Sequence, residues 1–146
     1  MKKVSIALVQ MESEIGKIDK NLAKIEKYIH QASENKVDII CFPELSVTGY
    51  SPDKSPEYAE LIPGSHSFVL SQWAQENHMT ILAGICEKNE DHKPFITQVV
   101  CMNNGSILKY RKTHLAPHEI GHFSTGQEFP IFQISQVRFG IEICWE

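Results

Sequence analysis

Two apolar segments separated by an amphipathic one most strongly constrain the fold of this chain. Residues 4–11 and 37–42 are rich in β-branched and aliphatic residues, as strands buried on both faces are. Residues 19–35, between them, carry apolar residues at spacings of three and four, which predicts a helix with one buried face. These apolar residues are Leu22, Ile25, Ile29 and Ala32. The strand–helix–strand order implies a right-handed crossover and a parallel pair of strands.

The rest of the chain predicts one more helix and five more strands. Phe68, Val69 and Trp73, with an early serine as a candidate N-cap, indicate a helix over residues 65–78. The expected strands are residues 79–87, 95–102, 106–112, 130–135 and 137–144. The second and third of these flank the sequence Asn-Asn-Gly, which is typical of an antiparallel hairpin. The order βαβαβββ followed by two strands therefore predicts an α/β fold with mixed sheets.

Composition limits the domain count and the partners. A chain of 146 residues that is 42% hydrophobic can bury one substantial core, so we expect one domain over residues 1–146. Lys and Arg number 14 against 18 acidic residues, with no basic cluster longer than two, so neither nucleic acid nor a membrane is an expected partner. The apolar run near the N-terminus is interpreted as a core strand and not a signal peptide, which indicates a cytoplasmic protein.

The four cysteines and the histidines bear on metal binding. Each cysteine lies in or beside an apolar run, as reduced cysteines on strands do, and no C-x-x-C pair occurs. His118, Glu119 and His122 form an H-E-x-x-H motif, the pattern of zinc metalloproteases. A helix there would start after Pro117 and contain Gly121, and no third ligand is evident. A zinc metalloprotease is therefore kept as the alternative hypothesis, beside three ordinary loop histidines.

Cys144 offers a different chemistry, nucleophilic catalysis. It ends the expected strand 137–144, where a tight elbow can present a nucleophile. A thiolate needs a carboxylate to take its proton and a cation to stabilise it, and Glu44 and Lys112 also follow strands. Both lie too far from Cys144 in sequence to form a local motif, so only the tertiary structure could bring the three side chains together. From pattern alone each residue also has an ordinary structural interpretation.

Three segments in this order resemble the nitrilase superfamily of carbon–nitrogen hydrolases: FPELSVTGY (42–50), YRKTHL (110–115) and FGIEICWE (139–146). The resemblance implies the N-terminal part of a four-layer αββα sandwich and a Glu–Lys–Cys triad. The triad falls on Glu44, Lys112 and Cys144. It implies hydrolysis of a small amide, carbamoyl or nitrile substrate through a thioester on the cysteine, without metal or cofactor.

The same resemblance assigns further roles. Glu119 is expected to be an auxiliary carboxylate near the lysine, and the backbone N–H of Trp145 an oxyanion donor. Tyr50 and His118 are candidate substrate contacts. A complete family member is expected to form a homo-oligomer.

Length and motif details depart from the family pattern. The family fold is nearly twice as long, and this chain stops two residues after Cys144, so we expect a domain incomplete at its C-terminus. We expect such a chain to expose an apolar strand edge and to be inactive alone, and a non-catalytic fragment is the third hypothesis. The ending Cys-Trp-Glu resembles the nitrilase branch, whereas YRKTHL resembles amidases and carbamoylases. We favour an amidase because the lysine segment is longer and Glu119 follows it at the amidase-like spacing.

Overall fold

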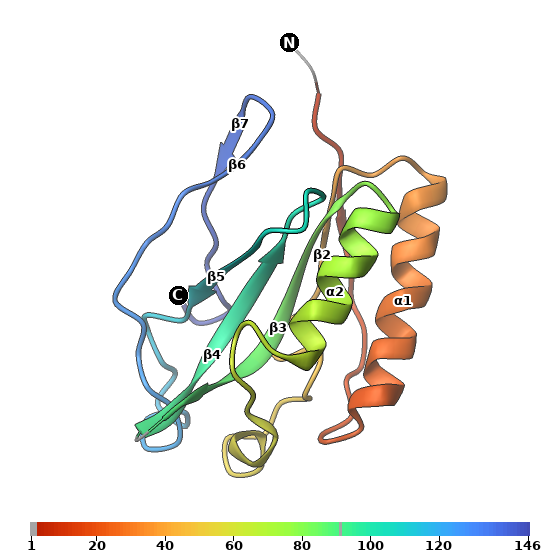
Figure 1. Cartoon of the computed structure of the whole chain (residues 1–146). Helices are drawn as coiled ribbons and strands as arrows, with labels where there is room; N and C mark the ends of the chain where they lie inside the picture. Colours follow the sequence, from red (N-terminus) through yellow and green to blue (C-terminus); the bar gives the residue numbers. More distant parts are fainter. Residues whose placement is uncertain (1–2, 91) are drawn as a thin grey trace.

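A five-stranded mixed sheet forms the centre of the protein in the computed structural model, which describes residues 3–90 and 92–146 (Figure 1). In spatial order its strands are β1 (Ile6–Leu8), β2 (Ile39–Cys41), β3 (Thr80–Asn89), β4 (His92–Cys101) and β5 (Ile107–Arg111). The first three strands are parallel, and β4 and β5 continue the sheet antiparallel. The predicted α/β fold, with its parallel pair and its hairpin around Asn-Asn-Gly, is confirmed.

Two helices cover one face of this sheet (Figure 1). They are α1 (Ile18–Glu34) and α2 (Ser65–Glu76), and a short 3₁₀ helix, η1 (Ser55–Tyr58), precedes α2. Strands β6 (Phe132–Ile134) and β7 (Val137–Phe139) pair only with each other, as a separate two-stranded sheet. Within the described part of the chain, neither helix has the length and apolar character needed to cross a membrane.

Alternation along the strands divides the core into two clusters. Ile40, Ile81 and Val99 point to the helical face, where they pack with the predicted apolar stripe of α1. Their neighbours in sequence point to the opposite face and pack with residues of β6 and of the last segment of the chain; they are Ile39, Leu82 and Val100. The near-continuous apolarity of these strands follows from burial on both faces.

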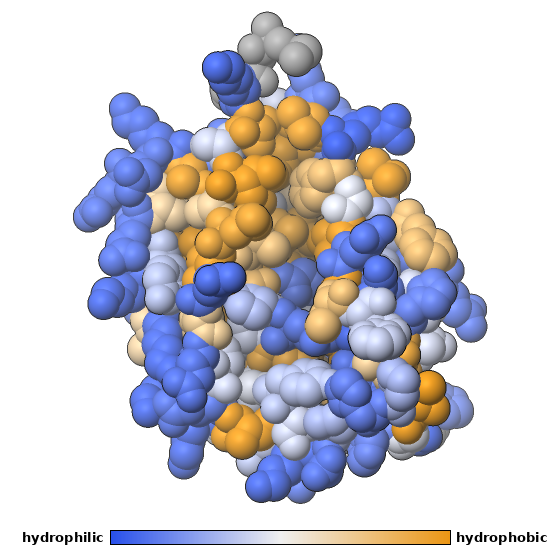
Figure 2. Space-filling view, turned by 180° about the vertical axis from the view of Figure 1, so that it is seen from behind, coloured by the Kyte–Doolittle hydropathy of each residue, from blue (hydrophilic) through white to orange (hydrophobic). Residues whose placement is uncertain are grey.

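The second face is only partly covered. Figure 2, a view from behind, shows apolar residues gathered on that side of the molecule. On edge strand β1, Leu8 is 80% exposed and Ile6 is also exposed. An apolar surface of this kind is unusual for a monomer in water.

Two expectations about element ends are wrong. The N-cap of helix α2 is Gly64 and not a serine; the Ser67 hydroxyl, in the first turn of the helix, accepts from the Gly64 N–H at 2.8 Å. Phe68 is 61% exposed because the buried face of α2 is formed by smaller residues such as Ala74. The last strand ends at Phe139 instead of residue 144, since the chain leaves the β6–β7 pair there.

Asn21 links α1 to the loop that follows β2. Its Oδ1 accepts from the Glu14 N–H at 2.9 Å, and its Nδ2 donates to the carbonyls of Glu14 at 2.8 Å and Val47 at 3.0 Å. The side chain is fully buried, so these groups have no access to water as a substitute partner.

Asn21→Ala should therefore lower the free energy of unfolding by roughly 2–4 kcal/mol, because it leaves several buried polar groups unpaired. Urea denaturation followed by circular dichroism measures this difference. The control is Asn35→Ala, since Asn35 donates to Gln31 at an exposed helix end, and its cost should stay below about 1 kcal/mol. If both variants lowered the free energy of unfolding equally, the structural role given to the buried Asn21 hydrogen bonds would be wrong.

Candidate active site

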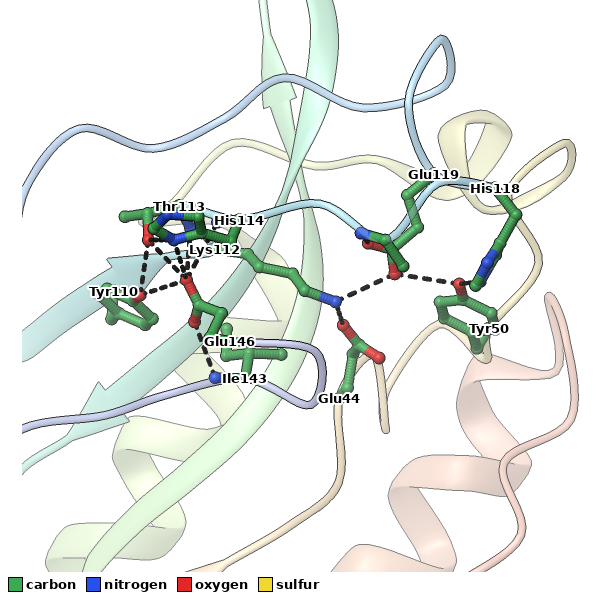
Figure 3. Close-up of polar contacts among 11 residues, drawn as sticks. Glu44, Tyr50, Tyr110, Lys112, Thr113, His114, His118, Glu119, Ile143 and Glu146 are labelled. Atoms are coloured by element: carbon green, nitrogen blue, oxygen red, sulfur yellow. Dashed lines mark hydrogen bonds and ion pairs between the residues drawn. The ribbon is translucent and has the colours of Figure 1, made fainter.

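A buried lysine lies at the centre of the candidate site. Lys112 directly follows β5, and its side chain is 0% exposed. Its Nζ lies 2.6 Å from Glu44 Oε1 and 3.0 Å from Glu119 Oε1 (Figure 3). The fold thus brings Glu44, 68 positions away in sequence, and Glu119, seven positions away, to the same lysine, which is the grouping that the resemblance implied.

The two carboxylates compensate for burying the ammonium. Burial lowers the pKa of Lys112, but the hydrogen bonds to Glu44 and Glu119 outweigh it, and the net pKa lies above 10.5. Lys112 therefore stays charged at neutral pH. Burial raises the pKa of Glu44 above 4.5 despite the opposing effect of Lys112, and the negative charge of Glu119 adds to the rise. Glu44 is thereby made a stronger base than an exposed glutamate.

The two glutamates differ in how their oxygens are used. Glu119 Oε1 accepts from Lys112 and, at 3.0 Å, from the Tyr50 hydroxyl, while its Oε2 accepts from the Ala116 N–H at 2.7 Å. Glu44 Oε1 accepts from Lys112, and its Oε2 accepts no hydrogen bond from the described residues. Only Glu44 has an oxygen available to take a proton.

Tyr50 and His118 form the outer edge of this network (Figure 3). The Tyr50 hydroxyl oxygen lies 2.7 Å from His118 Nε2 as well as bonding to Glu119. Burial, followed by the bond to Glu119, raises the pKa of Tyr50 well above 10, so the phenol stays protonated and acts as a donor. Both residues are at the site, although contact with substrate remains a prediction.

The H-E-x-x-H segment does not have the conformation that a zinc protease needs. Residues 118–122 form turns and a short bridge instead of a helix, so the helical spacing that would align His118 and His122 is absent. Glu119 is committed to the Lys112 network. Across residues 3–90 and 92–146, His, Cys, Asp and Glu side chains nowhere gather in groups of three or more that could hold a metal ion. The structure therefore does not favour the zinc hypothesis.

Glu44 is held by an unusually close backbone contact. It lies in the turn that follows β2, where Leu45 has a φ of 47°. This turn rests directly on Gly84 of β3: a Cβ there would overlap the Leu45 nitrogen and lie 2.8 Å from the Pro43 carbonyl oxygen. The Val47 N–H also donates to the Gly84 carbonyl at 3.0 Å. Glycine at position 84 thus allows the Glu44 turn to lie against the sheet.

Cys144 lies in a tight turn, not at the end of a strand as expected. Its φ is 50°, in the left-handed region that non-glycine residues seldom occupy, and the turn closes with a 3.3 Å bond from the Glu146 N–H to the Ile143 carbonyl. Strained turns of this kind present nucleophiles in many enzymes. The thiol is exposed and shares a cavity of about 490 Å³ with Glu44.

Trp145, the expected oxyanion donor, follows Cys144 in the turn. Its side chain is 63% exposed, and among the described residues its backbone N–H has no hydrogen-bond acceptor. The N–H is therefore free to bind a ligand oxygen near Cys144.

Two buried carboxylates near this site, Glu146 and Glu87, are not indicated by any sequence pattern. Glu146 accepts hydrogen bonds from the segment after Lys112 and from Ile143 (Figure 3). Glu87 on β3 binds Arg111 through both oxygens, at 2.8 and 2.7 Å, and Lys109 at 2.5 Å, which ties β5 to the sheet just before Lys112. Neither residue belongs to a hydrophobic repeat or a local motif that would reveal its role. All but one of the side chains that they bind are more than 20 positions away in sequence.

The chain is similar to known proteins over nearly its whole length. A family model described as carbon–nitrogen hydrolase matches residues 5–146. A probable nitrilase of Schizosaccharomyces pombe is 34% identical, with 99% of this chain and 56% of the relative covered. The human omega-amidase NIT2 is 30% identical, with 97% and 54% covered.

A solved structure shows the same fold. Nit3 of Saccharomyces cerevisiae, a member of branch 10 of the nitrilase superfamily, superposes with a TM-score of 0.87 at 25% identity, over 97% of this chain and 55% of that one. The chain thus spans little more than half the length of the relatives it matches. Because these relatives carry both nitrilase and amidase names, they do not decide between the two activities.

The close contact at Gly84 predicts a specific sensitivity. Gly84→Ala should lower the free energy of unfolding by about 1–3 kcal/mol, because the added methyl displaces the backbone of the Glu44 turn. Gly140→Ala is the matched control, since a Cβ at Gly140 meets nothing within 4 Å. Urea denaturation of both variants checks the difference, and a Gly84 variant as stable as the Gly140 variant would show that the turn tolerates the methyl.

Proposed function

The chain belongs to the carbon–nitrogen hydrolase family, and we propose that its site hydrolyses the carbon–nitrogen bond of small amides through a thioester on Cys144. The observation that carries the proposal is the buried Lys112 ammonium between Glu44 and Glu119, beside the cavity that Glu44 shares with Cys144. That arrangement supplies a base, a cation and a nucleophile without a metal ion.

The first half of the reaction forms the thioester. The Cys144 thiol gives its proton to the free oxygen of Glu44, and the sulfur attacks the amide carbonyl carbon. The resulting oxyanion is stabilised by the Lys112 ammonium and by the free N–H of Trp145. Glu44 then passes the proton to the amide nitrogen, the carbon–nitrogen bond breaks, and ammonia or an amine leaves.

The second half regenerates the enzyme. A water molecule loses a proton to Glu44, and its oxygen attacks the thioester carbon. The carbon–sulfur bond breaks, the carboxylic acid is released, and the proton on Glu44 returns to the Cys144 sulfur. The raised pKa of Glu44 suits both steps, because the same group must take and return a proton near neutral pH.

The hydrogen bonds support Glu44, and not Glu119, as the proton carrier. Glu119 receives three donors and has no oxygen left for a substrate proton. Its contribution is to hold the Lys112 ammonium in place. Tyr50 and His118 are assigned to substrate binding because they lie at the edge of this network. There they can contact the part of the substrate that is distant from the reacting carbon.

We favour an amide over a nitrile as the substrate. The lysine segment and the seven-residue step from Lys112 to Glu119 have the amidase-like pattern. The leaving nitrogen of a primary amide must also be protonated, and Glu44 can give it the proton that it took from the Cys144 thiol. Parallel assays with a short-chain amide and the nitrile of the same acid test this preference, and faster hydrolysis of the nitrile would reverse it.

Three substitutions test the roles at the site through ammonia release from short amides, measured in a chain completed to the length of its relatives because this chain is expected to be inactive alone. Cys144→Ala should reduce hydrolysis at least about 1,000-fold, because the nucleophile is lost. Glu44→Gln should reduce it about 100-fold or more, and Glu119→Gln about tenfold, because it only holds the lysine. Mass spectrometry of the acylated Cys144 peptide identifies the intermediate directly.

Controls separate this chemistry from the alternatives. Cys101→Ala removes a buried thiol on the helical face of the sheet and should retain activity. A chelator should leave hydrolysis unchanged. Activity that survives Cys144→Ala or disappears with the chelator would rule the thioester mechanism out.

The acid limb of the pH profile reports on Glu44. Catalysis requires its unprotonated form, so the rate should fall as the pH drops through the pKa of Glu44, which lies above 4.5. Glu119→Gln removes a negative charge that raises this pKa, so the acid limb should move to lower pH. Rates measured from pH 4 to 8 for both proteins check the direction, and an acid limb that moves upward or not at all would contradict it.

A further inference from the structure

We infer that Glu146 is a positioning residue: its carboxylate fixes the turn that presents Cys144 against the segment that carries Lys112. The inference rests on the proposed function, because it gives Glu146 a role in aligning the nucleophile with the cation. Glu146 itself touches neither the Lys112 ammonium nor the free oxygen of Glu44.

The carboxylate of Glu146 joins two segments that are 30 residues apart. Oε1 accepts from the Thr113 N–H at 2.7 Å, the Thr113 hydroxyl at 2.6 Å, the His114 N–H at 3.1 Å and the Tyr110 hydroxyl at 2.7 Å. Oε2 accepts from the Ile143 N–H at 2.7 Å. Thr113 directly follows Lys112, and Ile143 directly precedes Cys144, so one side chain connects the neighbours of both residues (Figure 3).

The charge of Glu146 is maintained although the group is buried. Its side chain is only 5% exposed. Burial raises the pKa of Glu146, but the hydrogen bonds from Thr113 and Tyr110 outweigh it and hold the pKa below 4.5. At neutral pH the group is a carboxylate that accepts bonds on both oxygens. In Glu146→Gln, the side-chain NH₂ group would replace one carboxylate oxygen and would face N–H or O–H groups that also donate, so the hydrogen bonds of that oxygen would be lost.

The conformation of Cys144 requires such a constraint. A cysteine with a φ of 50° is held in an unfavourable region of the backbone map, so the surrounding contacts must stabilise it. Among the described residues, the one backbone–backbone hydrogen bond that closes the turn is the 3.3 Å bond from the Glu146 N–H to the Ile143 carbonyl. The Glu146 carboxylate makes stronger bonds than this one, because a hydrogen bond to an ionised acceptor is stronger than one between neutral groups.

The test is the alkylation rate of Cys144 by iodoacetamide at pH 7, with the labelled cysteine identified by mass spectrometry. Cys144 is the exposed cysteine, while Cys86 and Cys101 are buried and have pKa values raised to about 12 by burial, so they react slowly. The variants are Glu146→Gln and Glu146→Asp, and Glu34→Gln is an exposed control with the same change of charge. Thermal unfolding confirms that each variant is folded at the assay temperature.

A positioning role, an electrostatic role and a purely stabilising role of Glu146 predict different changes in the alkylation rate of Cys144. If Glu146 aligns the thiol with Lys112, Glu146→Gln should slow alkylation about tenfold, the effect of losing one strong hydrogen bond. Loss of a negative charge by itself would favour the thiolate and speed the reaction. A merely stabilising role would leave an exposed thiol in the folded chain unchanged or faster. Glu146→Asp, which keeps the carboxylate, should recover part of the rate, and Glu34→Gln should match the wild type.

Two outcomes distinguish failure of the inference from failure of the proposed function. If Lys112→Met slows alkylation and Glu146→Gln does not, the positioning role is wrong and the proposed function stands. If wild-type Cys144 reacts no faster than N-acetylcysteine and is insensitive to Lys112→Met, the thiol is not activated, and both proposals fail.

Discussion

The buried ammonium of Lys112 is the interaction on which the site depends. A charge removed from water is costly unless it is paired, and this one is paired twice, with Glu44 and Glu119. Each carboxylate comes from a different loop, so the pairing determines where both loops lie. The same pairing keeps the lysine protonated, and of the two carboxylates Glu44 alone keeps an oxygen that accepts no hydrogen bond from the described residues.

Backbone geometry supports this electrostatic centre. The Glu44 turn can lie against β3 only because residue 84 has no side chain, and Leu45 takes a positive φ there. The Cys144 turn also contains a positive φ, stabilised by the carboxylate of Glu146. Glu44 and Cys144 are therefore both carried by constrained turns, whereas Lys112 directly follows a regular strand that Glu87 ties to the sheet.

The candidate site residues lie in loops, apart from the helices that cover the sheet. Helices α1 and α2 cover one face, and Glu44, Lys112 and Cys144 all lie in segments that follow strands (Figure 1). This is the usual place for function in α/β proteins, because loops at strand ends can vary while the core is retained. The partly exposed apolar surface around Leu8 lies on the other face of the sheet.

The sequence by itself determined the order of elements and the parallel and antiparallel pairings, and its resemblance to a known family pointed to Glu44 and Glu119 as neighbours of Lys112. These features depend on local periodicity, on turn chemistry and on motifs whose residue types suit one reaction. The ends of elements were less well predicted: the last strand stops at Phe139, and α2 buries small residues instead of Phe68. Local apolar patterns do not reveal which side chains find a partner surface.

Only the tertiary structure decided which glutamate has a free oxygen, that residues 118–122 are not helical, and that Glu146 joins the neighbours of Cys144 and Lys112. Most of the hydrogen bonds behind these facts join residues that are 30 or more positions apart; the exceptions are the local contacts of Glu119 and the bond from the Ile143 N–H to Glu146. No sequence period encodes such bonds, because each depends on how several loops approach one another around a single buried charge.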